Sequence, residues 1–294
     1  MMKSSRRYAR RKYRFVIRCG VTLIEILVVI GVVSLLLAIL LPAVQHSREA
    51  SLRLQCGNQL RQLAVAAQNY ESSFGVFPTK HFLREIQPYI ETQNQQNRVS
   101  LFGCPSDGNN AIGLPGEGKV SYAINAGLGS RQYEHAGIVS KPRRYTRTAE
   151  VTDGLSNTAM IGEKLSFPWY APQVVAWDEL RGDWNRTFLF FRAEANSPDE
   201  FSDECRSLTI RPLGVWFFTE EYHHLMPPNS RSCLHVNDEG MVTGGDFSVG
   251  ANAGSVHNGG THIAFSDGSV RFIHSEIETS IWRAYGTRSG GEAF

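Results

Sequence analysis

The sequence lacks the short motifs that mark common catalytic and nucleotide-binding sites. It has no GxSxG nucleophile motif, no HExxH zinc-protease motif and no P-loop. Its five cysteines never stand in a CxxC pair, which argues against a zinc cluster of the usual spacing. The pattern therefore singles out no enzyme, and we predict a protein without a catalytic site, a resident metal or another cofactor.

Acidic residues are absent from the first 20 positions, which carry eight Lys and Arg. The rest of the chain has 22 Lys and Arg against 28 Asp and Glu, a formal charge of about −6. The basic pI comes from this first segment alone, so nucleic acid is not an expected partner. A basic segment directly before an apolar run predicts a membrane protein whose N-terminus stays in the cytoplasm.

Charge is nearly absent from residues 21–41, an apolar run that ends before Pro42. At about 1.5 Å per residue, a helix of this length spans about 30 Å, the thickness of one hydrocarbon core. The single charged residue in the run is Glu25. Because a carboxylate in lipid is costly unless a cation pairs with it, Glu25 is a candidate functional residue.

Three kinds of N-terminal signal compete to explain this run. A cleaved secretory signal needs a shorter run followed by a small-x-small site, and residues 38–47 offer no clean one. An uncleaved signal anchor explains the length and the orientation, but not Gly20, Glu25 and Pro42 together. A third kind of signal is cut on the cytoplasmic side, before the apolar run, so that the helix remains in the membrane.

The stretch CGVTLIEILVVI at residues 19–30 resembles the class III signal of type IV pilins and type II secretion pseudopilins. The resemblance implies cleavage after Gly20, methylation of Val21, and pairing of Glu25 with the terminal amine of a neighbouring subunit during assembly. One departure is Val21, where the family usually has phenylalanine. The implied partners are the lipid bilayer, prepilin peptidase and other pilin or pseudopilin subunits. The implied location is the inner membrane, crossed once, with the head in the periplasm or at the cell surface.

Beyond Pro42 the sequence predicts an amphipathic helix that continues the membrane span. Pro42 is expected to kink this helix, Gly57 to loosen it, and Gly75 and Pro78 to end it. We therefore divide the chain into a leader at 1–20, a membrane and spine helix at 21–75, and a head at 76–294. The apolar residues at helical spacing are Leu60, Leu63, Ala64, Ala67, Tyr70 and Phe74.

The head has short β-rich runs instead of helical periodicity. Runs at 159–161, 214–218, 261–265 and 270–273 predict strands, and Asp267-Gly268 between the last two is a strong hairpin signal. The predicted fold class is α+β. A long N-terminal helix packs on a mainly antiparallel sheet with long loops, as in pilins.

Four cysteines remain once Cys19 leaves with the leader. An even number outside the cytoplasm predicts two disulfides with three possible connectivities, and free buried thiols are the alternative. The four are Cys56, Cys104, Cys205 and Cys233.

Several motifs are spread over the chain: QCGNQL at 55–60, CPSD at 104–107, SYAINAG at 121–127, DGLSNT at 153–158 and MPPNS at 226–230. With His257, Asp267 and Gly268 in an H-X9-DG spacing, they resemble the bacterial family DUF1559, whose members carry a prepilin-type signal. The resemblance covers nearly the whole chain from Gly20 and implies an architecture rather than an activity. A catalytic or metal-binding role of His257 competes with a structural one, in which it holds the hairpin by hydrogen bonds.

Other side chains of the head are weaker candidates. Asp107, Asp153 and Glu163 offer oxygen ligands that suit calcium, but without a DxDxDG run they are more typical of turns. His223 and His224 would point to opposite sides of a strand, which disfavours a transition-metal site. The tryptophans are more often core than a glycan or partner surface. They are Trp169, Trp177, Trp184, Trp216 and Trp282.

The sequence favours a structural function, that of a pilin-like or pseudopilin-like subunit anchored by its N-terminal helix. The competing hypothesis is a monomeric anchored binding module or enzyme that uses the prepilin signal for sorting. It predicts an exposed pocket or aromatic groove in a head that works without its helix.

Overall fold

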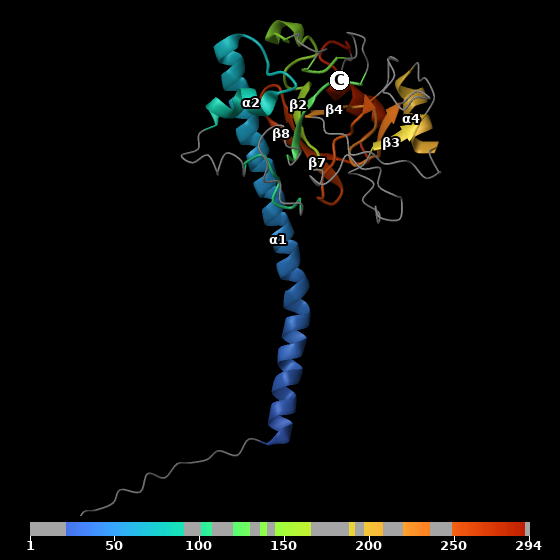
Figure 1. Cartoon of the computed structure of the whole chain (residues 1–294). Coiled ribbons are helices and arrows are strands. Elements are labelled where there is room, and N and C mark those ends of the chain that lie inside the picture. The colour runs from blue at the N-terminus through green and yellow to red at the C-terminus, as the bar shows by residue number, and fades with distance from the viewer. Residues whose placement is uncertain are drawn as a thin grey trace, which may run out of the picture. The chain divides into compact units, whose positions relative to one another are not determined.

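The computed structural model describes the chain from residue 22 to residue 291, with gaps (Figure 1). The chain divides into two compact units, Met1–Arg48 and Glu49–Phe294, and the boundary between them lies inside the first helix. The leader, Gly20, Val21 and the run at 214–218 lie outside the described residues. The described residues are 22–90, 101–107, 120–129, 136–139, 145–165, 188–191, 197–207, 220–235 and 249–291.

Helix α1 runs from Leu23 to Phe74 and continues through Pro42, as the sequence predicts. Gly75 ends it with a φ of 69°, in the left-handed region that favours glycine. The Gly75 N–H still bonds to the Glu71 carbonyl at 2.7 Å, which satisfies one of the last carbonyls. The predicted end near Gly75 is confirmed.

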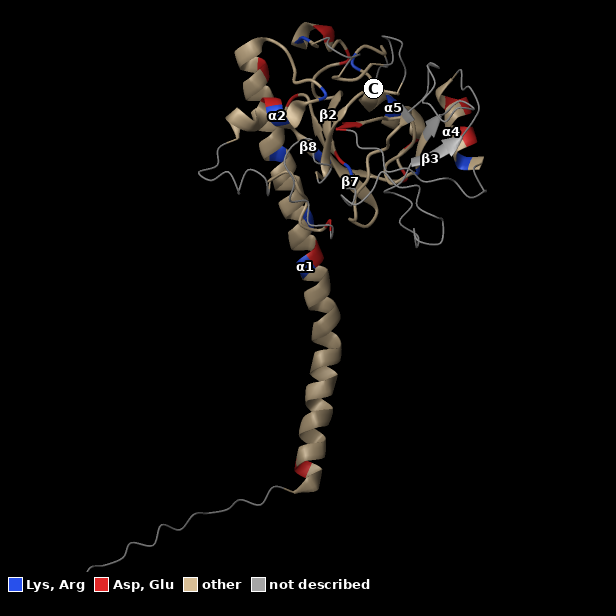
Figure 2. Cartoon of the chain, viewed as in Figure 1, with Lys and Arg blue, Asp and Glu red and all other residues tan. Residues whose placement is uncertain are grey.

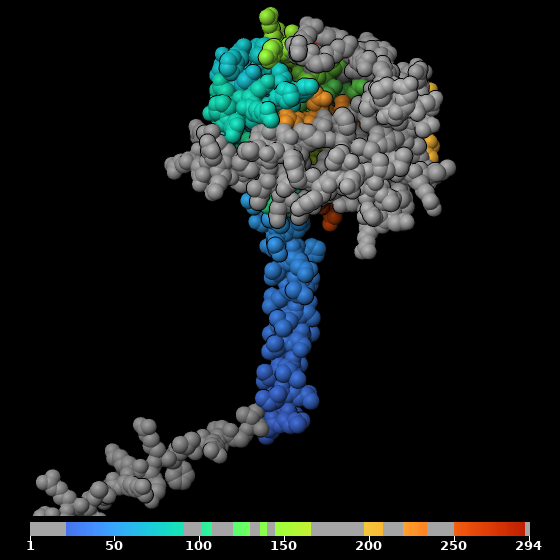
Figure 3. All heavy atoms as spheres, viewed as in Figure 1, coloured from blue at the N-terminus to red at the C-terminus, as the bar shows by residue number. Residues whose placement is uncertain are grey.

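In the first unit every described residue is exposed, including 16 large hydrophobic side chains (Figure 3). Figure 2 shows no Lys, Arg, Asp or Glu on α1 between Glu25 and Arg48. In the described part of the chain, α1 is the one helix long and apolar enough to cross a membrane.

The later part of α1 buries one face in the head. The predicted apolar stripe is confirmed up to Tyr70, but Phe74 is 62% exposed, so its prediction as a packed residue is wrong. Its ring lies on Tyr70 with centroids 4.6 Å apart, at the last turn of the helix, where solvent reaches it. The buried residues of α1 are Cys56, Leu60, Leu63, Ala64, Ala66, Ala67 and Tyr70.

The main sheet has five strands in the order β4–β1–β2–β7–β8. All neighbours pair antiparallel except β1 and β4, which are parallel. This confirms the predicted α+β fold class, with a parallel pair that the sequence did not predict. The strands are β1 (Tyr122–Asn125), β2 (Ala159–Glu163), β4 (Glu221–Tyr222), β7 (Gly260–Phe265) and β8 (Val270–His274).

Alternate residues of the main sheet face two different cores, because successive side chains of a strand point to opposite faces. Tyr122 and Ile124 of β1 join the core built with α1. Ala123 instead clusters with Trp282 of helix α5 (Thr279–Gly286). The sheet therefore lies between α1 and α5.

A smaller sheet in the order β3–β5–β6 completes the head. Helix α4 contributes Phe201 and Cys205 to the same hydrophobic cluster as Cys233 of β5. The elements not yet given are β3 (Phe188–Phe191), α4 (Pro198–Ser207), β5 (Ser232–His235), β6 (Val249–Gly250), α2 (Phe82–Ile86) and the short 3-10 turns η1 (Gln87–Tyr89) and η3 (Thr148–Glu150).

Strands β7 and β8 form the predicted hairpin, with Thr261 opposite Ile273. Asp267 Oδ1 accepts hydrogen bonds from the Ser269 N–H at 2.9 Å and the Ser269 hydroxyl at 2.6 Å. Gly268 has a φ of 83°, which a turn of this kind needs. Asp267 and Gly268 thus make the turn, as the sequence predicts.

Candidate functional site

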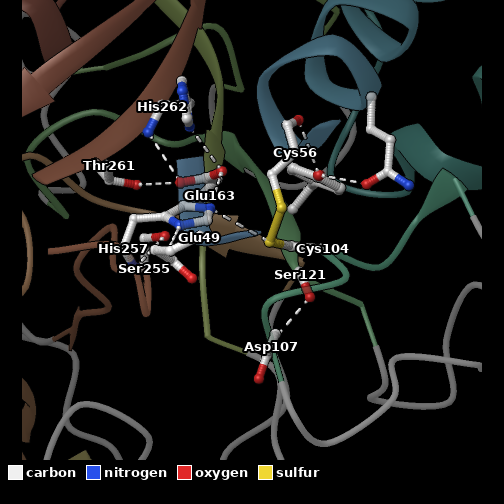
Figure 4. Close-up of a disulfide and its surroundings, with 12 residues drawn as sticks. Glu49, Cys56, Cys104, Asp107, Ser121, Glu163, Ser255, His257, Thr261 and His262 are labelled. Carbon is white, nitrogen blue, oxygen red and sulfur yellow. Dashed lines mark hydrogen bonds and ion pairs between the residues drawn. A yellow bond between two sulfur atoms is a disulfide. The ribbon is translucent and has the colours of Figure 1, made fainter. Parts of the chain in front are cut away.

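The described head brings several potential ligand side chains together around one disulfide, between Cys56 of α1 and Cys104 (Figure 4). Glu163 at the end of β2 and His257 in the segment before β7 complete a group of four buried residues. One potential ligand atom from each lies within 4.8 Å of the other three. We call Cys56, Cys104, Glu163 and His257 the disulfide cluster.

Glu163 is held by three hydrogen bonds from β7. Its Oε2 accepts from the His262 N–H at 2.9 Å and from the Thr261 hydroxyl at 3.2 Å, and its Oε1 accepts from His262 Nδ1 at 3.0 Å. Burial alone would raise the pKa of Glu163, but the hydrogen bonds and charge of His262, with the charge of His257, lower it below its ordinary value. Glu163 is therefore a buried carboxylate that keeps its charge.

His257 links α1 to the disulfide cluster. Its Nδ1 donates to Glu49 Oε1 at 2.7 Å. Its Nε2 lies 3.7 Å from Cys104 Sγ and 4.0 Å from Glu163 Oε1. The predicted role of holding the hairpin is therefore corrected, because these ring nitrogens face α1, the disulfide and β2 rather than both hairpin strands.

Close packing of α1 brings the cluster together. A Cβ at Gly57 would stand 3.1 Å from His262 Nε2, so the glycine lets α1 approach β7 closely. Gly57 lies inside an unbroken helix, and its role is this close approach rather than the predicted loosening. Tyr122 of β1 adds a hydrogen bond from its hydroxyl to the Cys56 carbonyl at 3.1 Å.

Glu25 occupies a second site, at the start of α1. Its Oε2 accepts hydrogen bonds from the Thr22 N–H and the Thr22 hydroxyl, both at 2.7 Å. The Glu25 N–H donates to the Thr22 hydroxyl at 3.3 Å. This reciprocal arrangement is a capping box of the pattern T-x-x-E, which satisfies free N–H groups at a helix start. The capping role was visible in the sequence but was not predicted.

The family model described as "Protein of unknown function (DUF1559)" matches residues 45–89 and 84–280. The chain belongs to the DUF1559 family. The match reaches from the later part of α1 beyond the hairpin and so includes the whole disulfide cluster. Searches of curated proteins and of solved structures found no match.

In this DUF1559 protein the two halves of the H-X9-DG motif do different things. His257 belongs to the disulfide cluster, whereas Asp267 and Gly268 make the turn ten residues later. Strand β7 lies between them and carries His262 to Glu163.

The cysteines pair as Cys56–Cys104 and Cys205–Cys233, one of the three connectivities left open. Two disulfides indicate that the head folds in an oxidising compartment.

The three calcium candidates have separate protein partners. Asp107 accepts from the Ser121 hydroxyl at 3.2 Å, and Asp153 accepts from two backbone N–H groups near residue 290. Glu163 is held by β7. The described residues do not bring these three carboxylates into one group of ligand atoms.

His223 and His224 are buried on different partners. His223 Nδ1 accepts from the Ala251 N–H at 3.1 Å, whereas His224 Nδ1 donates to the Trp282 carbonyl at 2.8 Å and its ring stacks on the Trp282 ring. Burial lowers the pKa of each histidine to about 3. Trp282 is fully buried, as core residues are, and the other tryptophans lie outside the described residues. They are Trp169, Trp177, Trp184 and Trp216.

Glu49, Thr261 and His262 were missed by sequence reasoning. Thr261 and His262 lie in a run that was predicted only as a strand, and Glu49 lies 208 residues from its partner His257. Among the contacts that were not predicted, the T-x-x-E capping pattern at Thr22 is the one that neighbouring residues in the sequence could have indicated.

Proposed function

We propose that this DUF1559 protein is a non-enzymatic, membrane-anchored pilin-like subunit. In this proposal prepilin peptidase cuts after Gly20 and methylates Val21. The processed chain then assembles with other pilin-type subunits, with its head on the far side of the membrane.

The observation that supports the proposal is that the first part of α1 is exposed and apolar, whereas its later part is packed in the head. Its first part exposes 16 large hydrophobic side chains, and its later part belongs to the core of the head. Covering each such side chain is worth about 1.5–3 kcal/mol, so leaving all of them in water would cost tens of kcal/mol. Lipid, and in an assembly neighbouring helices, would supply that cover.

Glu25 is the residue on which assembly would depend. After cleavage the amine of Val21 would lie one turn before Glu25, and the amine of a neighbouring subunit would supply the cation that a carboxylate in lipid needs. The capping box offers a competing explanation of Glu25, because the cap stabilises the helix of a single chain.

Two variants separate these explanations. Glu25→Gln keeps a capping side chain but loses the charge, and Glu25→Ala loses both. The full chain would be expressed with prepilin peptidase, its N-terminus identified by mass spectrometry, and its assembly measured by cross-linking in membranes. We expect every chain to begin at N-methyl-Val21. We expect both variants to assemble more than about tenfold less than the unchanged chain, because an unpaired partner charge costs about 3–5 kcal/mol.

Each part of the proposal can fail separately. A chain that begins at Met1 or after residue 40 contradicts the cleavage. Assembly of Glu25→Gln at the unchanged level, with loss in Glu25→Ala, assigns Glu25 to the cap alone. Unchanged assembly of both variants removes Glu25 from assembly altogether.

A further inference from the structure

We propose that the reduced head binds one Zn²⁺ ion through the four residues of the disulfide cluster. Two cysteine sulfurs, one imidazole nitrogen and one carboxylate oxygen form the donor set. Donors of these kinds in a group of four are typical of tetrahedral zinc. The four residues come from distant parts of the chain, so no short sequence motif predicts the site.

The distances around His257 fit such a centre. With Zn–S and Zn–N bonds of ordinary length, a tetrahedral ion places its sulfur and nitrogen ligands about 3.5 Å apart and its nitrogen and oxygen ligands about 3.3 Å apart. His257 Nε2 lies 3.7 Å from Cys104 Sγ and 4.0 Å from Glu163 Oε1. Small side-chain movements would bring these donors to a shared ion.

The surrounding hydrogen bonds already orient the donors. Glu49 accepts from His257 Nδ1, which directs Nε2 toward the cluster, and a carboxylate in this place is a common support for a zinc-bound histidine. Thr261 and His262 fix the Glu163 carboxylate in the same way. The outer contacts of a metal centre are therefore present in the oxidised head.

The disulfide and the ion are alternative states of the same sulfurs. A dithiol or phosphine reductant supplies two electrons, the S–S bond breaks, and two protons from the solvent give two thiols. Zn²⁺ then binds both sulfurs as thiolates and releases those two protons. In the oxidised head the two sulfurs are bonded to each other, so the thiolate ligands do not exist.

Cobalt is a direct probe of the site, because thiolate ligands give Co²⁺ intense charge-transfer absorption. The full chain in detergent would be reduced with a phosphine under argon and titrated with Co²⁺, followed by displacement with Zn²⁺. We expect one Co²⁺ per reduced chain with the spectrum of a tetrahedral thiolate site, and no such absorption from the oxidised chain. Circular dichroism would be recorded at each step.

The second disulfide supplies a matched control. The paired change Cys205→Ser and Cys233→Ser should leave cobalt binding unchanged, whereas Cys56→Ser with Cys104→Ser should abolish it. Glu49→Gln should weaken binding about tenfold, because it removes a support of His257 and not a ligand.

Three results would overturn the proposal. One is a reduced, folded chain without thiolate-to-cobalt absorption, and another is unchanged absorption after the Cys56 and Cys104 substitutions. The third is a chain that unfolds on reduction and stays unfolded with cobalt, since metal binding to a real site would restore the fold. None of these results depends on cleavage or assembly at the N-terminus.

Discussion

Glu220 is a buried carboxylate next to β4. In the described part of the chain Oε2 makes no hydrogen bond, and His81 Nδ1 lies 3.9 Å from it. Burial raises the pKa of Glu220 to about 7, although the charges of Arg84 and Lys80 oppose the shift. The folded head therefore binds a proton at Glu220 more tightly than the unfolded chain does.

The sign of the resulting pH dependence follows from that raised pKa. The contribution of Glu220 to stability is fully present below about pH 4.5 and is lost as the pH rises to about 7. Glu220→Gln removes the titration. We expect this variant to match the unchanged protein at pH 4 and to exceed it by about 1–3 kcal/mol at pH 8, by thermal unfolding in detergent.

The exposed Glu276 offers a control on the same head. Glu276→Gln removes one exposed carboxylate from the same head and is compared with Glu220→Gln at both pH values. Equal behaviour of the two variants at pH 8 would show that Glu220 is ionised at little cost.

At the scale of elements, the β7–β8 turn is tied to α1. Gln68 Nε2 donates to the Ser266 carbonyl at 3.3 Å, and a Cβ at Gly268 would come within 2.7 Å of the Gln68 side chain. The hairpin turn therefore relies on Gly268 for both its backbone conformation and its contact with the helix.

Gly268→Ala tests this double dependence. The left-handed backbone should cost about 1–2 kcal/mol, and displacement of Gln68 should cost about 1 kcal/mol more through the lost hydrogen bond. Gly75→Ala is the matched control, because Gly75 also has a positive φ but nothing within 4 Å of its Cβ position. Denaturant unfolding of both variants measures the difference, and equal losses would mean that the Gln68 contact is unimportant.

At the scale of the whole molecule, the two disulfides serve different cores. Cys56–Cys104 joins α1 to the main core over a separation of 48 residues, and Cys205–Cys233 joins α4 to β5 over 28 residues. Loop closure alone makes them worth about 4 and about 3.5 kcal/mol. The two disulfides contribute similar free energies of stabilisation, so their removal should differ chiefly in which core of the head is destabilised.

Hydrogen exchange with mass spectrometry distinguishes the two. Cys205→Ala with Cys233→Ala should raise exchange in α4 and β5 and spare β7 and β8. Cys56→Ala with Cys104→Ala should raise it across α1 and the main sheet. Exchange in β7 and β8 that rises equally in both variants would contradict the separation of the cores.

Much of this protein was decided locally and could be predicted. The apolar run, its single acid at Glu25, the end of α1 at Gly75 and the Asp267-Gly268 turn each depend on residues close together in the chain. Helix periodicity and turn chemistry act over a few residues, so the sequence by itself determined these elements, and the spread of its motifs indicated the family.

The disulfide cluster was decided by the tertiary structure alone. Glu49 and His257 meet across 208 residues, and Glu163 and His262 across 99. Such contacts depend on how α1 packs on the main sheet and on which strands become neighbours. The spacing of the cysteines along the chain therefore argued against a zinc site. Packing in space instead brings one potential ligand atom from each of two cysteines, a histidine and a glutamate within 4.8 Å of one another.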